Sequence, residues 1–104
     1  MMNIRRCNMP AYAVIDIDVK DQARYEEYKK KGALTIEQYN GKPLIRGGEV
    51  EVVEGNWQPK RMVIIEFKDM EALKRWWSSP EYSEAKKLRH QAAQANVVFI
   101  EGLK

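Results

Sequence analysis

The sequence has 104 residues, 44% of them apolar, and its 18 Lys and Arg against 15 Asp and Glu give a formal charge of +3. A chain of this length forms one domain that buries about 60 to 70% of its unfolded surface without needing a disulfide or a metal. Arg5 and Arg6 supply most of the excess charge. The remainder is close to neutral, so the composition does not indicate nucleic-acid binding.

Cys7 is the only cysteine, which excludes an internal disulfide and suits a reducing cytoplasm. No apolar run approaches the roughly 20 residues of a membrane helix, and the N-terminal stretch lacks a secretory pattern. We therefore expect a cytoplasmic protein with neither a membrane nor a nucleic acid as partner.

Met9-Pro10-Ala11-Tyr12 resembles the natural start of a protein chain. We assign residues 9–104 to one domain and treat residues 1–8 as an N-terminal arm, either an extended start or a disordered segment.

The first half of the domain predicts a strand followed by a helix. Residues 11–19 alternate, with Ala11, Ile15 and Ile17 on one face and Tyr12, Val14 and Asp16 on the other. A period of three to four residues then predicts a helix that ends near Asn40-Gly41; its inner face carries Tyr25, Tyr28, Gly32, Ile36 and Tyr39. Gly32 lies inside this stripe, where glycine costs about 1 kcal/mol relative to alanine, and suggests close packing or a slight break.

Residues 42–54 are expected to be extended, with a bulge or bend at Gly47-Gly48. Turn residues at 55–60 lead to a strand at 61–67, rich in branched side chains, so the two extended segments should form an antiparallel hairpin.

Asp69 is expected to cap a helix whose apolar stripe is Met70, Leu73 and Trp77, with Trp76 at the edge of the stripe. Ser79 and Pro80 should start a further helix that runs to about Ala95. Residues 97–100 then form the last strand.

The resulting order, βαββαβ, predicts an α+β ferredoxin-like sandwich: a four-stranded antiparallel sheet with helices on one face. The central strands are apolar on both faces, as in Val14 beside Ile15 and Ile64 beside Ile65. We therefore expect a homodimer through the open sheet faces. The alternative is that Tyr12, Asp16, Met62 and Glu66 make this face polar enough for water.

From Met9 to Leu103 the sequence resembles the bacterial domain-of-unknown-function 1330 family of the dimeric α+β barrel superfamily. The shared elements are Ala11-Tyr12, Tyr25-x-x-Tyr28, Gly41, Leu44-x-Arg46-Gly47-Gly48, Glu54-Gly55-x-Trp57, Glu66-Phe67, Ser79-Pro80-Glu81-Tyr82, Leu88-Arg89 and Glu101-Gly102. The resemblance implies a ferredoxin-like protomer and a two-sheet dimer. It does not imply one chemistry, because the superfamily includes cofactor-free oxygenases, haem-degrading enzymes, isomerases and ligand-binding modules.

Arg89 lies on the apolar stripe of its helix, with Tyr82 and Ala85, and should point toward the sheet. A buried arginine requires an anion, which is either a structural carboxylate (Asp16 or Glu66) or a ligand. Arg46, before the glycine bend, is either an edge-strand charge or a second contact that holds a ligand carboxylate with Arg89.

Tyr12, Tyr28, Trp77 and Tyr82 are expected either to line a cavity beside these arginines or simply to form core. Asp16 and Glu66, on the two central strands, are candidates for an acid/base pair or for a partner of the arginine. His90 should be solvated, and no residue cluster has metal-ligand spacing, so we expect neither a metal nor a cofactor.

Two classes of function remain open. We expect the protein to bind a small organic acid or aromatic metabolite, as a cofactor-free oxygenase or isomerase would. The alternative is a non-catalytic binding or protein-interaction module.

Overall fold

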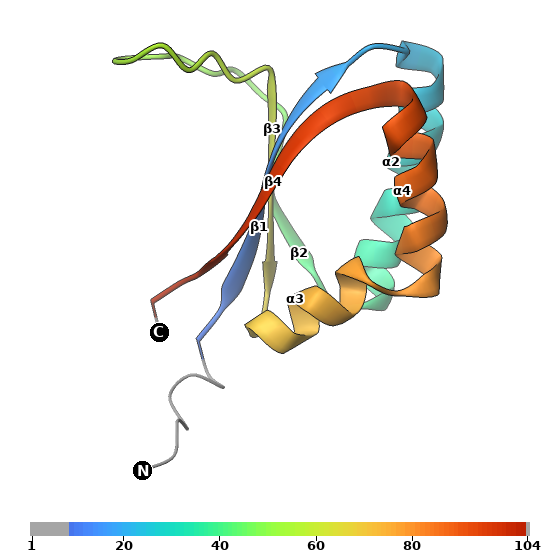
Figure 1. The fold of residues 1–104 in the computed structure, drawn as a ribbon. Coiled ribbons are helices and arrows are strands. Elements are labelled where there is room, and N and C mark those ends of the chain that lie inside the picture. The colour runs from blue at the N-terminus through green and yellow to red at the C-terminus, as the bar shows by residue number, and fades with distance from the viewer. Residues whose placement is uncertain (1–8, 104) are drawn as a thin grey trace.

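The computed structural model describes residues 9–103, so the predicted arm at 1–8 lies outside the described residues. Three helices cover one face of a four-stranded sheet and leave the other face open (Figure 1). The elements are β1 (Ala11–Val19), α2 (Gln22–Gln38), β2 (Lys42–Arg46), β3 (Arg61–Phe67), α3 (Met70–Trp77), α4 (Pro80–Ala92) and β4 (Ala93–Glu101). The predicted βαββαβ order and the ferredoxin-like class are confirmed, with the second helical segment divided into α3 and α4.

The sheet has the order β2-β3-β1-β4, and every neighbouring pair is antiparallel. In β1 the alternation assigns residues to faces as predicted, since Ala11, Ala13, Ile15 and Ile17 are all buried under the helices. Val14 lies between Ile64 of β3 and Val98 of β4, and Ile64 in turn pairs with Ile45 of β2. An apolar row therefore crosses the open face.

Each helix begins at a side-chain cap. Asp21, Asp69 and Ser79 accept hydrogen bonds from the backbone N–H three residues later, and Pro80 occupies the first position of α4. Such caps satisfy N–H groups that have no partner within the helix.

The core is built around Trp76 and Tyr82, whose ring centroids are 4.2 Å apart. The indole N–H of Trp76 donates to Thr35 Oγ1 at 3.0 Å, which joins α3 to α2. The prediction that Trp77 rather than Trp76 lies at the centre of the stripe is wrong. Ala72, Leu73 and Trp76 form the buried face of this short helix, and Trp77 is only partly buried at its edge.

Two boundaries also differ from prediction. Helix α4 ends at Ala92 and β4 begins at once with Ala93, because pairing with Val19 of β1 extends that strand back to Ala93. The expected long hairpin is paired only over 42–46, and residues 47–60 form an arm that projects from the sheet toward the open side (Figure 1).

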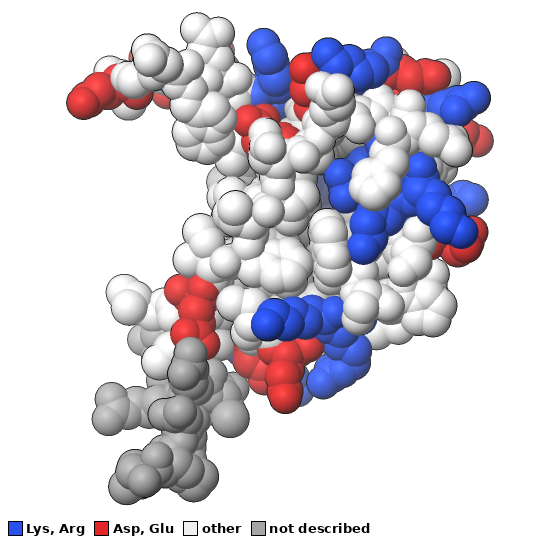
Figure 2. Space-filling model, viewed as in Figure 1, with Lys and Arg blue, Asp and Glu red and all other residues white. Residues whose placement is uncertain are grey.

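The open side is mostly uncharged and hollowed between this arm and the far end of the sheet (Figure 2). Val98 and Ile100 on this face are each about half exposed, and Trp57 on the arm is 62% exposed. Within the described range no helix is long and apolar enough to span a membrane.

Candidate functional site

An apolar pocket of about 80 Å³ lies between α2 and the strands β1, β2 and β3. Its floor comes from the helix-facing alternation of two strands, with Ile15 and Ile17 from β1 and Val63 and Ile65 from β3. Gly32 of α2 forms part of its roof, and a Cβ there would meet the Tyr28 ring at 3.4 Å. Of the two alternatives for Gly32, the slight break is wrong, because α2 is continuous through this residue. Gly32 instead packs close to the Tyr28 ring.

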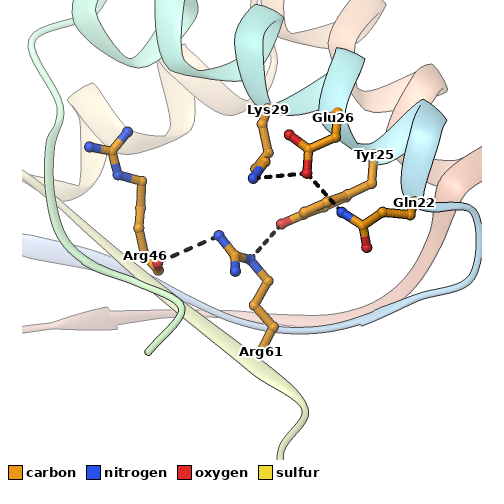
Figure 3. A network of polar contacts seen from close by, with 6 residues as sticks. All are labelled: Gln22, Tyr25, Glu26, Lys29, Arg46 and Arg61. Carbon is orange, nitrogen blue, oxygen red and sulfur yellow. Dashed lines mark hydrogen bonds and ion pairs between the residues drawn. The ribbon is translucent and has the colours of Figure 1, made fainter. Parts of the chain in front are cut away.

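Three cations surround the mouth of this pocket: Lys29, Arg46 and Arg61. Arg61 Nε donates to the Tyr25 hydroxyl at 3.0 Å, and its Nη2 lies 3.5 Å from the Arg46 carbonyl oxygen (Figure 3). Lys29 forms an ion pair with Glu26 at 3.2 Å. One carboxylate thus faces three positive side chains, so the mouth has an excess of hydrogen-bond donors and positive charge.

The phenol of Tyr28 lines the inner wall of the pocket, and its oxygen lies 2.9 Å from that of Tyr82. Burial, followed by the Tyr82 hydroxyl, raises the pKa of Tyr28 well above its ordinary value. Tyr28 therefore remains a neutral hydroxyl at physiological pH.

The structure brings only some of the predicted site residues together. Arg46 and Tyr28 line the α2 pocket, and Tyr82 contacts Tyr28 from behind. Arg89 and Trp77 instead line a separate groove along the opposite edge strand, β4. The expectation that Arg46 and Arg89 hold one carboxylate between them is therefore wrong, because they border different cavities.

Tyr12, Asp16 and Glu66 lie on the open face, and none of them lines the α2 pocket or the groove along β4. Asp16 lines a separate polar hollow beside Trp57. The Tyr12 hydroxyl donates to Glu66 Oε2 at 3.0 Å, which raises the pKa of Tyr12. Asp16 accepts from the Trp57 indole at 3.1 Å and from the Lys60 backbone N–H at 2.9 Å, so it anchors the arm. Tyr12 is consequently not a wall of the cavity under the helices.

The proposed Asp16 and Glu66 pair is also wrong. Tyr12 is opposite Glu66 whereas Asp16 is opposite Met62, which leaves the two carboxylates four residues apart along the sheet, about 13 Å. Neither carboxylate reaches Arg89, because the sheet separates them from α4.

Sequence reasoning missed Arg61, Lys29 and Tyr25. The alternation of β3 could have predicted the position of Arg61. It lies on the same face of the strand as Val63, Ile65 and Phe67, which is the face toward the helices. Lys29 is the first residue of the run Lys29-Lys30-Lys31, which composition alone does not resolve. Its position around the helix, next to Tyr28, is what makes it partly buried.

His90 is exposed, as predicted. Among residues 9–103 no cluster of His, Cys, Asp and Glu has the arrangement of a metal site.

The element order and the antiparallel sheet define a ferredoxin-like α+β domain. The chain belongs to the family described as Domain of unknown function (DUF1330), which matches residues 10–103. The search of curated proteins found no match.

Solved structures confirm the architecture. A protein of unknown function from Rhodopseudomonas palustris has a TM-score of 0.77 at 18% identity, covering 93% of this chain and 85% of its own. A hypothetical protein from Arabidopsis thaliana has a TM-score of 0.67 at 16% identity, covering 91% and 89%. SnoaB, a cofactor-independent oxygenase from Streptomyces nogalater, has a TM-score of 0.60 at 10% identity, covering 93% and 95%. At these identities the likeness establishes the fold alone.

Proposed function

We propose that the protein binds a small carboxylic acid in the α2 pocket, with its short apolar tail inside and its carboxylate at the mouth. The observation that carries this proposal is the convergence of Lys29, Arg46 and Arg61 on an apolar pocket. Arginine matches a carboxylate with two parallel hydrogen bonds, and an apolar pocket with a few polar groups at one end is typical of small-molecule sites.

The size of the pocket limits the tail. Its volume of about 80 Å³ is roughly half that of an engineered cavity of about 150 Å³ that holds benzene. A short aliphatic acid, such as pentanoate, is therefore the appropriate probe, and a polycyclic substrate is too large.

Binding is favoured over turnover by the protonation of the lining groups. The raised pKa of Tyr28 keeps its phenol protonated, and the three cations at the mouth are hydrogen-bond donors. The one carboxylate there, Glu26, is paired with Lys29, and the hydrogen bond from Lys29 lowers its pKa, which makes it a weak base. A proton-abstracting base of the kind expected at Asp16 or Glu66 lies on the other face of the sheet. A non-catalytic binding module thus has more support than a cofactor-free isomerase or a cofactor-free oxygenase, although the structural neighbour SnoaB is a cofactor-independent oxygenase.

Calorimetric titration with pentanoate and with uncharged 1-pentanol tests this proposal. We expect saturable binding of pentanoate, much weaker binding of pentanol, and a loss of about tenfold or more in affinity for Arg46→Gln, since a hydrogen bond to a charged group contributes about 1.5 kcal/mol or more. Arg75→Gln, at an exposed position on α3, is the matched control and should bind normally. Equal affinity for the acid and the alcohol would contradict the proposed role of the cations.

Gly32→Ala provides a second variant that separates binding from folding. It removes a helix-interior glycine and should stabilise the unliganded protein by up to about 1 kcal/mol. The added methyl group narrows the pocket beside Tyr28, so pentanoate affinity should fall. Urea unfolding and calorimetry measure the two effects, and a gain in both would show that the pocket is not the binding site.

A second copy of the chain is the proposed occupant of the open face, because this face carries the apolar row of Ile45, Ile64, Val14 and Val98. The exposed valines and Trp57 of the arm border the same side. We place this dimer in the cytoplasm, where a single cysteine suits reducing conditions.

A further inference from the structure

Arg89 lies on the inner side of α4 and is only 3% exposed. It borders a groove of about 450 Å³ between the C-terminal half of α4, Trp77 and the edge strand β4. This groove shares no lining residue with the α2 pocket.

The Arg89 side chain has a buried hydrogen-bond donor without a partner. Its Nε atom is fully buried and makes no hydrogen bond, and no carboxylate within residues 9–103 forms an ion pair with this side chain. Burial of an unpaired charge is strongly unfavourable, and arginine does not escape the penalty by losing its proton. An anionic ligand in the groove would supply an acceptor for this donor and a counter-charge for the guanidinium.

The surroundings of Arg89 are positive and apolar. Lys86 Nζ lies 4.0 Å from the centroid of the Trp77 ring, and the Arg89 guanidinium carbon lies 5.9 Å from it. Partial burial lowers the pKa of Lys86, and the nearby positive charge of Arg89 lowers it further. Ala93, Ala95 and Val97 form the apolar wall along β4.

We propose that this groove is a second binding site, in which Arg89 pairs with the carboxylate of a small organic acid whose apolar body lies against Trp77 and β4. The planar guanidinium fork favours a planar carboxylate, and the alanine and valine wall favours a hydrocarbon body over a hydrated anion. The site is independent of the α2 pocket, and neither proposal requires the other.

The same reasoning predicts an effect on stability. Because the unliganded groove leaves a buried charge unpaired, Arg89→Met should raise the Tm of the unliganded protein while abolishing stabilisation by the ligand. A purely structural arginine gives the opposite result, since its loss lowers the Tm and leaves any stabilisation by the ligand in place.

NMR titration of the wild-type protein tests the site directly, because the Arg89 Nε–Hε group is the buried donor to which the carboxylate is proposed to bind. The probe is benzoate, with benzamide as a control of similar shape without charge, and inorganic phosphate as a hydrated anion. We expect benzoate to shift this resonance until it saturates. Benzamide and phosphate should bind with at least tenfold lower affinity. In Arg89→Gln, benzoate should cause no saturable shift of the backbone amides of Gln94 and Ala95, which line the groove.

Arg75→Gln is the matched variant and should respond to benzoate as the wild type does. If the Arg89 resonance does not shift, the groove proposal is wrong, even if benzoate or pentanoate binds elsewhere. If benzoate binds at Arg89 but Arg46→Gln does not change the affinity for pentanoate, the proposed site in the α2 pocket is wrong instead. An equal response to phosphate would overturn the assignment to an apolar carboxylate. The wild-type measurement does not depend on the folding of any variant.

Discussion

The hydroxyl pair of Tyr28 and Tyr82 connects α2 to α4 behind the candidate pocket, at an O–O distance of 2.9 Å. Because burial raises the pKa of Tyr28 in the folded protein, the unfolded chain loses this proton at a lower pH than the folded chain does. The stability contributed by the neutral phenol is therefore complete below about pH 10 and is lost as the pH rises toward the folded pKa.

Tyr28→Phe should lower the free energy of unfolding by about 1 kcal/mol at pH 7, through loss of the hydrogen bond. The deficit relative to wild type should shrink above pH 10, where the wild type loses the contribution of this phenol. Urea unfolding at both pH values measures the difference, and a deficit that does not change with pH would contradict the assigned pKa direction.

At the scale of elements, Thr35 joins α2 to α3. Its hydroxyl accepts from the Trp76 indole at 3.0 Å and donates to the Gly32 carbonyl at 2.8 Å. Thr35→Val keeps the shape of the side chain but leaves the indole N–H without an acceptor, and should destabilise the fold by about 1 to 3 kcal/mol. Thr35→Ser keeps the hydroxyl and should unfold at a urea concentration closer to wild type. Equal unfolding midpoints for Val and Ser would contradict the role of this hydrogen bond.

The elements were largely predictable because alternation and capping are local signals. The faces of β1, the caps Asp69 and Ser79, and the paired part of 42–46 with 61–67 all followed from spacing within a few residues. The candidate site was less predictable, because it depends on which strand neighbours which helix. Arg46 and Tyr28 share a pocket and Arg89 does not, and this distinction comes from the sheet order β2-β3-β1-β4.

At the scale of the whole molecule, the proposed dimer requires the apolar row on the open face. Val98→Asp places a charge in this row, at a side chain that is about half exposed in the protomer. We expect a wild-type dimer and a monomeric, folded Val98→Asp variant in sedimentation equilibrium. Leu34→Asp is the matched control, since Leu34 is 61% exposed on α2 on the opposite side of the molecule, and should remain dimeric. A monomeric wild type would show instead that the open face is hydrated.

The central claim is that a short carboxylic acid occupies the pocket under α2. It is tested most directly by intermolecular NOEs between the terminal methyl group of pentanoate and isoleucine methyl groups of the protein. The isoleucines supply their own control, because Ile15, Ile17 and Ile65 line the pocket whereas Ile64 and Ile100 lie on the open face. We predict NOEs to the first three and none to the last two. NOEs confined to the open face, or none at saturating pentanoate, would contradict the account.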